Sequence, residues 1–331
     1  MITPWNEGIL RKITADRDRM PHSWLFCGPP GLGKNGVACR YSEMLLGEVR
    51  GFSAGSQPDF HVLCPEAELD PEGSLLQRYG MRYYVTKPGQ QPKSVISVDQ
   101  VRALSNAIIS FGHGSFKVVL ITPAHKMNIN AANALLKSLE EPPTNTVFIL
   151  VSDRPDLLPA TILSRCSRID FRIPPRDEAL TWLSGKTDNG RAAIALDVAR
   201  GAPLLAEEYL SSGFLDARDA VIRDIQSVMS GRIDVTTLPG RWKDLGMASS
   251  LSIFYGVMSD LVKTRYMPKS PGLINPDQLD WLHPTSKRIH LKRVFALLER
   301  VGRYLQDTNS PLDKNLLLED LFLDLIKVGK K

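Results

Sequence analysis

The sequence is poor in the residues and patterns that mark several protein classes. Only four cysteines occur in 331 residues, namely Cys27, Cys39, Cys64 and Cys166. They are scattered and form no C-x-x-C pair, which favours reduced thiols and gives no ligand spacing for a metal. No stretch approaches about 20 uninterrupted apolar residues, and no apolar N-terminal run precedes a cleavage-like site. We therefore expect a cytoplasmic chain without disulfides, a bound metal or a membrane partner.

A large excess of one charge is also missing. The net charge is only +5, from 41 lysines and arginines against 36 acidic residues. This small excess is compatible with a nucleic-acid neighbour, but no recognition-helix motif accompanies it, so a stand-alone DNA-binding protein is a weak alternative. The apolar share of 43% is ordinary for a soluble globular protein. A chain of this length more often forms two or three domains than one.

Strand-like and helix-like segments alternate over residues 1–168. The apolar, partly β-branched runs that we expect to form strands are 23–27, 59–64, 117–121, 146–151 and 168–171. The helical patterns between them are 34–46, 97–110 and 128–141, the last stopped by Pro142 and Pro143. Strands that alternate with helices predict an α/β domain whose mostly parallel sheet is covered on both faces.

Strand signals disappear after Pro174. A short helical region, about 176–210, is followed by longer amphipathic helices up to residue 331. Residues 315–328 are apolar on more than one face, which suits a helix packed inside an assembly. The sequence thus predicts a small helical domain over 169–210 and an all-α domain over 211–331.

The stretch GPPGLGKNG, Gly28–Gly36, differs by one residue from a phosphate-binding P-loop, G-x-x-x-x-G-K-S/T. It follows an apolar strand and precedes a helix, as a P-loop does. Asn35 stands where the hydroxyl residue should bind Mg²⁺, and an amide is a poorer ligand for this cation. We interpret the loop as a degenerate nucleotide site made of Gly28, Gly31, Gly33, Lys34 and Asn35.

Two further parts of a hydrolytic site are missing. The strand 117–121 runs into Thr122 and Pro123, where P-loop enzymes carry the acids that hold Mg²⁺ and activate water. His125, just beyond, is either a replacement base or a solvated loop histidine, and we favour the second reading. In many such ATPases a Gly-x-x-Arg at a helix start reaches the γ-phosphate, but here Leu204 follows Gly201 at that spacing. We therefore expect no ATP hydrolysis.

Several segments resemble the bacterial DNA polymerase III clamp-loader subunits, which are AAA+ proteins. They are PHSWLFCGPPGLGK (21–34), QPDFHVLCPE (57–66), SVDQVRAL (97–104), AANALLKSLEEPP (131–143) and SRC (164–166). Asn35, the absent acids and the Gly-Ala-Pro at Gly201 are similar to the delta-prime branch of this family rather than to its ATPase subunits, tau and gamma. The resemblance is dense over residues 1–210 and thin beyond.

The resemblance implies a RecA-like AAA+ domain at 1–168, a lid domain at 169–210 and a collar, or oligomerisation, domain at 211–331. It implies a non-hydrolysing member of a hetero-oligomer with tau/gamma and delta subunits. This complex belongs to the DNA polymerase III holoenzyme, a DNA-directed DNA polymerase, and loads the sliding clamp on primed DNA. No cofactor is implied beyond vestigial nucleotide binding. The alternative is an active ATPase subunit of the tau/gamma kind.

The resemblance also assigns a role to Ser164, Arg165 and Cys166. It implies that Arg165 is an arginine finger, offered in trans to the ATP site of a neighbouring subunit. The other reading is a surface arginine paired with a local acid.

The sequence departs from the family pattern in two places. Many relatives carry a zinc knuckle of four cysteines before the second strand, but residues 47–59 contain none, so we expect no zinc. Relatives connect the second strand to the next helix by a short link, whereas here this connection, residues 67–93, is long. Within it, Tyr79, Met81, Tyr83 and Val85 alternate with other residues. This pattern predicts an extra strand or hairpin. Its aromatics either stack on nucleic acid or pack on the surface; we favour packing and expect the insertion to be dispensable for folding.

Overall fold

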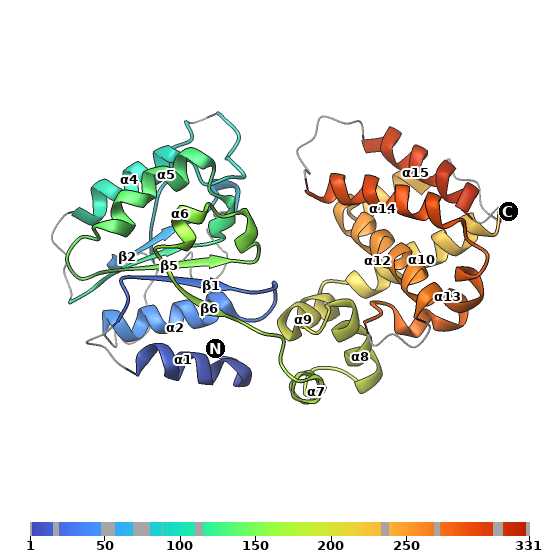
Figure 1. Cartoon of the computed structure of the whole chain (residues 1–331), viewed down its shortest axis with the longest axis horizontal. Coiled ribbons are helices and arrows are strands. Elements are labelled where there is room, and N and C mark those ends of the chain that lie inside the picture. The colour runs from blue at the N-terminus through green and yellow to red at the C-terminus, as the bar shows by residue number, and fades with distance from the viewer. Residues whose placement is uncertain are drawn as a thin grey trace. The chain divides into compact units, whose positions relative to one another are not determined.

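The chain forms two compact units, Met1–Pro174 and Pro175–Lys331 (Figure 1). The computed structural model describes residues 2–15, 20–47, 57–68, 80–87, 89–109, 115–232, 238–267, 272–306 and 314–328. The first unit contains the sheet, and in the second unit helices and no strands are found among the described residues. A further division of the second unit at residue 210 stays a prediction.

A six-stranded parallel sheet forms the centre of the first unit. Its strands are β1 (Ser23–Cys27), β2 (Gln57–Leu63), β3 (Gly80–Arg82), β4 (Lys117–Ile121), β5 (Thr146–Ser152) and β6 (Ser167–Asp170). They lie in the order β3-β2-β4-β5-β1-β6, and every neighbouring pair is parallel. β1, β4 and β5 are buried along their whole length, which explains their continuous apolar runs. The predicted parallel α/β fold is confirmed.

Helices cover both faces of this sheet (Figure 1). On one side lie α4 (Val98–Ile109), α5 (Ile129–Glu140) and α6 (Ala160–Leu163); on the other lie α1 (Glu7–Thr14) and α2 (Lys34–Leu46). α4 begins where the side chain of Gln100 accepts a hydrogen bond from the backbone N–H of Ser97, the return half of a capping box. At α5, Asn128 caps the first turn by accepting from the N–H of Ala131. Together these elements form a RecA-like domain.

Part of the 67–93 segment belongs to the sheet, and its expected dispensability for folding stays a prediction. Strand β3 pairs in parallel with β2, so the extra strand is confirmed, and it is not the antiparallel partner of β2. The buried carboxylate of Glu66 accepts the backbone N–H groups of Val85 and Thr86 at 2.6 and 3.1 Å. Residues 69–79, Tyr79 among them, lie outside the described part of the chain. Alternation alone could not predict these bonds, because they depend on a carboxylate outside the repeating pattern.

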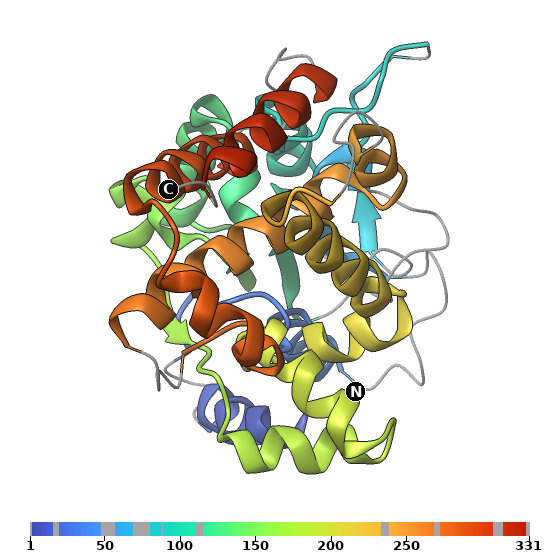
Figure 2. The same cartoon turned by 90° about the vertical axis from the view of Figure 1, so that its right-hand side faces the viewer.

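The second unit contains nine described helices. They are α7 (Arg176–Ser184), α8 (Asn189–Val198), α9 (Pro203–Ser211), α10 (Phe214–Met229), α11 (Leu238–Asp244), α12 (Met247–Tyr266), α13 (Leu279–Ser286), α14 (Leu291–Gln306) and α15 (Lys314–Val328). α7, α8 and α9 share one small core, and the longer helices surround a larger one that centres on Trp242, Phe254 and Phe322. Figure 2 shows this unit from its own side, with α14 and α15 next to each other.

The last helix, α15, carries apolar residues on more than one face, as its sequence predicts. Leu318, Leu321 and Phe322 are fully buried in the larger core, whereas Leu316 and Leu323 are exposed. Over the residues that the structure describes, no single helix is long and apolar enough to cross a membrane; α11 and α12 pass such a test only as a pair bent by 110°.

A buried histidine makes the stability of the first unit depend on pH. His61 on β2 is buried, and its Nδ1 lies 2.6 Å from the hydroxyl of Tyr83. Burial lowers the pKa of His61 from 6.5 to about 4. In the unfolded chain the imidazole is protonated below about pH 6.5, so the unfolded state binds more protons between these two values.

We therefore expect the free energy of unfolding to fall as pH is lowered from about 6.5 toward 4, by at most about 3 kcal/mol from this group. In the His61→Gln variant the amide can still accept from Tyr83, but it does not titrate. Urea unfolding between pH 7 and 5 should show a shallower slope for this variant. The slope that remains includes His125, whose pKa is also lowered by burial. Identical slopes in the two proteins would contradict the assignment.

Candidate functional site

The loop between β1 and α2 has the backbone of a P-loop. Gly31 and Gly33 have φ values of +74° and +89°, in the left-handed region, and Gly33 caps the N-terminus of α2. At Gly28 a Cβ atom would lie only 2.4 Å from the carbonyl oxygen of Phe171. The glycines are thus required by backbone conformation and by close packing, and the structure brings the predicted loop residues together at the end of a central strand.

The N-terminal segment holds this loop from the side. Both Trp5 Nε1 and Asn6 Nδ2 donate to the carbonyl oxygen of Leu32, at 3.1 and 2.7 Å. Asn6 is buried in this position. These contacts carry no sequence motif, because they join residues 26 and 27 positions apart in the chain.

Lys34 is turned inward and is only 5% exposed. Its Nζ donates to the carbonyl oxygens of Gly28 and Pro29, at 2.8 and 2.5 Å, and lies 2.6 Å from a carboxylate oxygen of Asp153. Asp153 directly follows β5, the strand next to β1. The sequence analysis did not single out Asp153, and no motif signal marks it. The loop lysine therefore has a carboxylate partner within its own chain.

The residues at the two Mg²⁺-ligand positions, Asn35 and Thr122, lie next to each other, but neither side chain is charged. The hydroxyl of Thr122, just past β4, donates to the side-chain carbonyl oxygen of Asn35 at 2.9 Å. In a hydrolytic P-loop enzyme these two places provide a hydroxyl and a carboxylate to the cation. Here an amide and a hydroxyl satisfy each other, so the pair fits a Mg²⁺–nucleotide complex poorly.

His125 is not the solvated loop histidine that we expected. It lies in the 3₁₀ turn Ala124–Lys126, half-buried, with Nδ1 3.2 Å from the hydroxyl of Ser152. Burial lowers its pKa, so the neutral ring is favoured. The turn following β4 places it against the end of β5 because the two strands are neighbours, a relation that chain order does not reveal.

Arg165 is held by three acceptors. Its Nη1 donates to the carbonyl oxygen of Thr161 at 2.9 Å and to the hydroxyl of Ser164 at 3.3 Å. Its Nη2 forms an ion pair with Glu140, the last residue of α5. The side chain of Arg165 is 33% exposed and that of Glu140 is 49% exposed. The alternative reading, a pair with a local acid, thus describes the side chain as it stands here.

Cys166 has a different character from its two neighbours in the motif. Its side chain is partly buried against the core beneath α5 and α6. Burial raises the pKa of its thiol to about 12, which makes the reactive thiolate scarce. Cys166 therefore anchors the segment, and Ser164 and Arg165 carry its accessible polar groups.

The arginine and the P-loop lie at opposite edges of the sheet. Ser167 pairs with Trp24 and Asp170 with Cys27, so β1 and β6 run side by side in the same direction. Arg165 precedes β6, whereas the loop follows β1. The paired strands alone separate the two edges by roughly 10 Å. Arg165 therefore lies at the opposite end of β6 from the loop, where its partners are Thr161, Ser164 and Glu140.

The remaining predicted features can be placed only in part. Leu204 lies in the first turn of α9, which begins at Pro203 after Gly201 with φ +84°. No group of three or more His, Cys, Asp or Glu residues that could hold a metal is found among the described residues. Most of the 47–59 segment is outside that set, so the expected absence of zinc stays a prediction.

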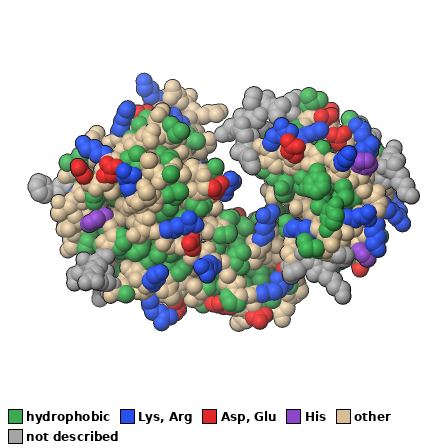
Figure 3. Space-filling view, viewed as in Figure 1, with side chains coloured by type: hydrophobic (Ala, Val, Ile, Leu, Met, Phe, Trp, Pro, Cys, Tyr) green, Lys and Arg blue, Asp and Glu red, His purple; other side chains and the backbone are tan. Residues whose placement is uncertain are grey.

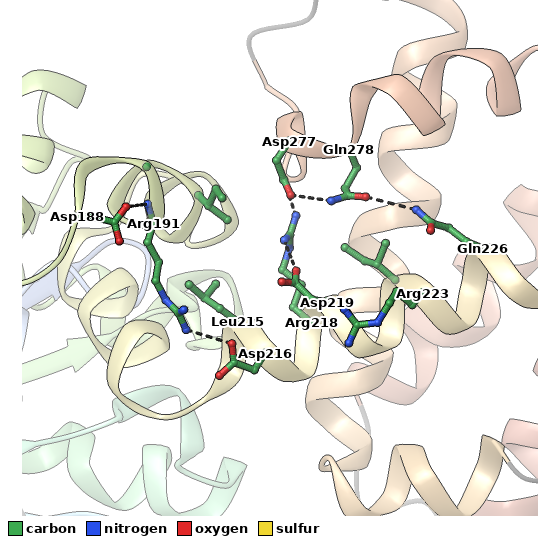
Figure 4. Close-up of a pocket in the computed structure, with 13 residues that line it drawn as sticks. Asp188, Arg191, Leu215, Asp216, Arg218, Asp219, Arg223, Gln226, Asp277 and Gln278 are labelled. Atoms are coloured by element: carbon green, nitrogen blue, oxygen red, sulfur yellow. Dashed lines mark hydrogen bonds and ion pairs between the residues drawn. The ribbon is translucent and has the colours of Figure 1, made fainter.

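A pocket of about 480 Å³ opens in the helical unit between α8, α10 and the 3₁₀ turn Pro276–Gln278 (Figure 4). The guanidinium of Arg218 points across it and is tied to Asn275, Asp219 and Asp277, at 2.9, 2.9 and 2.5 Å. Arg191 of α8 also lines the pocket and pairs with Asp216 of α10. Most of the charged lining is paired within the chain, so the pocket reads as a polar junction between helices.

Comparison with known proteins identifies the family. A family model described as "DNA polymerase III, delta subunit" matches residues 9–175, and one described as "DNA polymerase III, delta subunit, C terminal" matches residues 212–327. The delta-prime subunit of DNA polymerase III from Escherichia coli is 32% identical, over 69% of this chain and 67% of that protein. The chain belongs to the delta-prime family of DNA polymerase III subunits. It is a delta-prime-type subunit of the clamp loader.

Other relatives agree with this assignment. The delta-prime subunit from Pseudomonas aeruginosa is 29% identical over 97% of this chain and 96% of that protein. The tau subunit from Bacillus subtilis is 25% identical, and its match covers 92% of this chain but only 44% of that protein, so the tau/gamma alternative is not favoured. A solved gamma subunit-related protein from Thermotoga maritima is 18% identical over 98% of this chain and 99% of that one, with a TM-score of 0.47. That likeness is too low to add to the assignment.

The buried Arg218 supplies a test of the polar junction. Its side chain is only 2% exposed, so replacing it by methionine leaves the carboxylates of Asp219 and Asp277 without their cation. The carboxylates left behind are 49% and 22% exposed and can be solvated, so the cost is that of the lost hydrogen bonds, about 1–3 kcal/mol. We expect a loss of this order for Arg218→Met in chemical denaturation. Arg223→Met is the matched control, because Arg223 lies on the same helix and lines the same pocket but is exposed. Equal losses for the two variants would contradict this account.

Proposed function

We propose that this subunit does not hydrolyse ATP and instead offers Arg165 to the ATP site of a neighbouring clamp-loader subunit. The observation that carries the first half is the hydrogen bond between Thr122 and Asn35. In a hydrolytic site Mg²⁺ is held by oxygen ligands that include a carboxylate. The bound cation then activates the phosphoryl group. Here the two ligand positions are neutral and bond to each other, so the cation has no anchor.

Arg165 suits a role in trans because of its place at the amino edge of the sheet. It precedes β6, which is an edge strand, and it lies away from its own P-loop. A guanidinium presented to the developing charge of a partner's phosphate accelerates hydrolysis by about 10³–10⁵. It binds phosphate oxygens through a fixed fork of N–H donors, which lysine cannot provide.

The ion pair with Glu140 does not oppose this role. Both side chains are substantially exposed, and an exposed pair is worth at most about 1 kcal/mol. A rate effect of about 10³ corresponds to roughly 4 kcal/mol of transition-state stabilisation. The interaction of Arg165 with a partner's phosphate is therefore stronger than its ion pair with Glu140. Until the partner docks, Glu140 holds the guanidinium in place. The hydrogen bonds to Thr161 and Ser164 can persist in the complex.

The proposed partners are the tau/gamma and delta subunits, and through them the sliding clamp and primed DNA. Exposed apolar side chains on α14 and α15, namely Phe295, Leu316 and Leu323, support the use of the helical unit as a collar. Apolar side chains also gather on the face of this unit seen in Figure 3. With a net charge of only +5, the chain is suited to act on DNA as part of the complex. We place it in the cytoplasm, within the DNA polymerase III holoenzyme.

The first test is ATP turnover by the isolated full-length chain. We expect none above the background, with or without Mg²⁺, because neither Asn35 nor Thr122 supplies a charged ligand. The Lys34→Met variant should give the same background. ATP hydrolysis that Lys34→Met abolishes would instead identify an active ATPase of the tau/gamma kind.

The second test concerns Arg165 in a reconstituted clamp loader. Arg165→Ala should leave assembly unchanged but lower ATP turnover at the adjacent site, with clamp and primed DNA present. Arg165→Lys should restore little, because it lacks the guanidinium fork. Arg168→Ala is the matched control, since Arg168 is a nearby exposed arginine paired with Asp170. We expect a partial loss of total turnover, because other sites keep their own arginines. Unchanged adjacent-site turnover in a fully assembled Arg165→Ala complex would reduce Arg165 to a surface residue.

A further inference from the structure

The degenerate loop still has the parts that recognise a phosphate. Gly31 and Gly33 keep the left-handed conformation that turns the backbone around the start of α2, a helix of 13 residues. Lys34 follows in register. On backbone shape alone, this loop could take an anion, so the loss of the Mg²⁺ ligands does not by itself explain whether nucleotide binds.

The ammonium of Lys34 is engaged within its own chain. A lysine ammonium has three N–H donors and no acceptor. Two hydrogen bonds go to the carbonyl oxygens of Gly28 and Pro29, at 2.8 and 2.5 Å, and the carboxylate of Asp153 lies 2.6 Å away as an ion pair. The side chain of Lys34 is 5% exposed, so a phosphate oxygen could approach Nζ only by displacing one of these partners.

Of the three partners of Lys34, only Asp153 carries a charge. The two carbonyl oxygens belong to the loop itself and are neutral. The carboxylate of Asp153 comes from the end of β5, compensates the lysine charge and repels any second anion beside it. Its side chain is 36% exposed, so the carboxylate lies between the buried ammonium and solvent.

We propose that Asp153 is the residue that excludes nucleotide from this subunit, by occupying Lys34 in place of a phosphate group. The inference rests on the proposed function, since it explains how a non-hydrolysing chain also avoids holding an idle nucleotide. Thr122 and Asn35 remove the site for the metal, and Asp153 removes the site for the anion. The same ion pair ties the loop to the residue that follows β5.

The test measures binding of inorganic pyrophosphate, with ADP as a second probe, to the full-length chain by calorimetry without Mg²⁺. In Asp153→Ala the ammonium of Lys34 loses its ion-pair partner and the repelling charge is gone. We expect pyrophosphate to bind at least about tenfold more tightly than to the natural chain. Adding Lys34→Met to Asp153→Ala should abolish the gain.

Two further variants keep the result interpretable. Asp153→Asn preserves the size of the side chain and an acceptor for Lys34, so it should fold and show a smaller gain of the same sign. Asp156→Asn is the matched control, because Asp156 is an exposed carboxylate three residues away that pairs with Arg154 and not with Lys34. It should change nothing.

Equal pyrophosphate affinity in the natural chain, Asp153→Ala and Asp153→Asn would overturn the inference, whether that affinity is high or absent. ATP turnover by Asp153→Ala answers a separate question. Binding without turnover supports both the inference and the proposed function, because Asn35 and Thr122 still provide no metal site. Binding with turnover would support the role of Asp153 and contradict the non-hydrolysing role of the chain.

Discussion

The common direction of the six strands governs what this protein can do. Because every strand of the sheet runs the same way, all carboxyl ends meet at one edge and all amino ends at the other. The loop after β1, Thr122 after β4 and Asp153 after β5 therefore converge, although they are about 90 and 120 residues apart in the chain. The segment before β6, with Arg165, must lie at the opposite edge. The carboxyl ends of the strands thus carry the glycine loop with its partners, and the amino ends carry Arg165.

At both ends of the parallel strands a basic side chain is paired with an acidic one of the same chain. Lys34 is paired by Asp153, and Arg165 by Glu140. The two pairs differ in exposure, and this difference decides their consequences. The side chain of Lys34 is 5% exposed and paired at the end of a buried strand, whereas that of Arg165 is 33% exposed in a weak surface pair. The two proposals of a blocked lysine and an available arginine rest on this difference.

The helical unit also pairs its buried charged side chains with groups of the same chain. Arg218 is buried among Asn275, Asp219 and Asp277, and the carboxylate of Asp224 accepts a hydrogen bond from Trp242 at 3.0 Å. Buried charges are tolerated only when paired and hydrogen-bonded, so these contacts fix how the helices meet. The apolar cores supply most of the stabilising burial, and the polar contacts fix which residues face one another.

The sequence was enough to predict the parallel α/β unit, the helical unit, the position of the glycine loop after the first strand, and the family. These follow from local signals: continuous apolar runs, a capping box at Ser97, glycines at fixed spacing, and the absence of acids after 117–121. The fold was needed to show that Asp153 meets Lys34, that His125 is half-buried, and that residues 80–82 pair in parallel with β2. The physical reason is that strand order β2-β4-β5-β1 differs from chain order, so contacts between strand ends leave no periodic trace in the sequence.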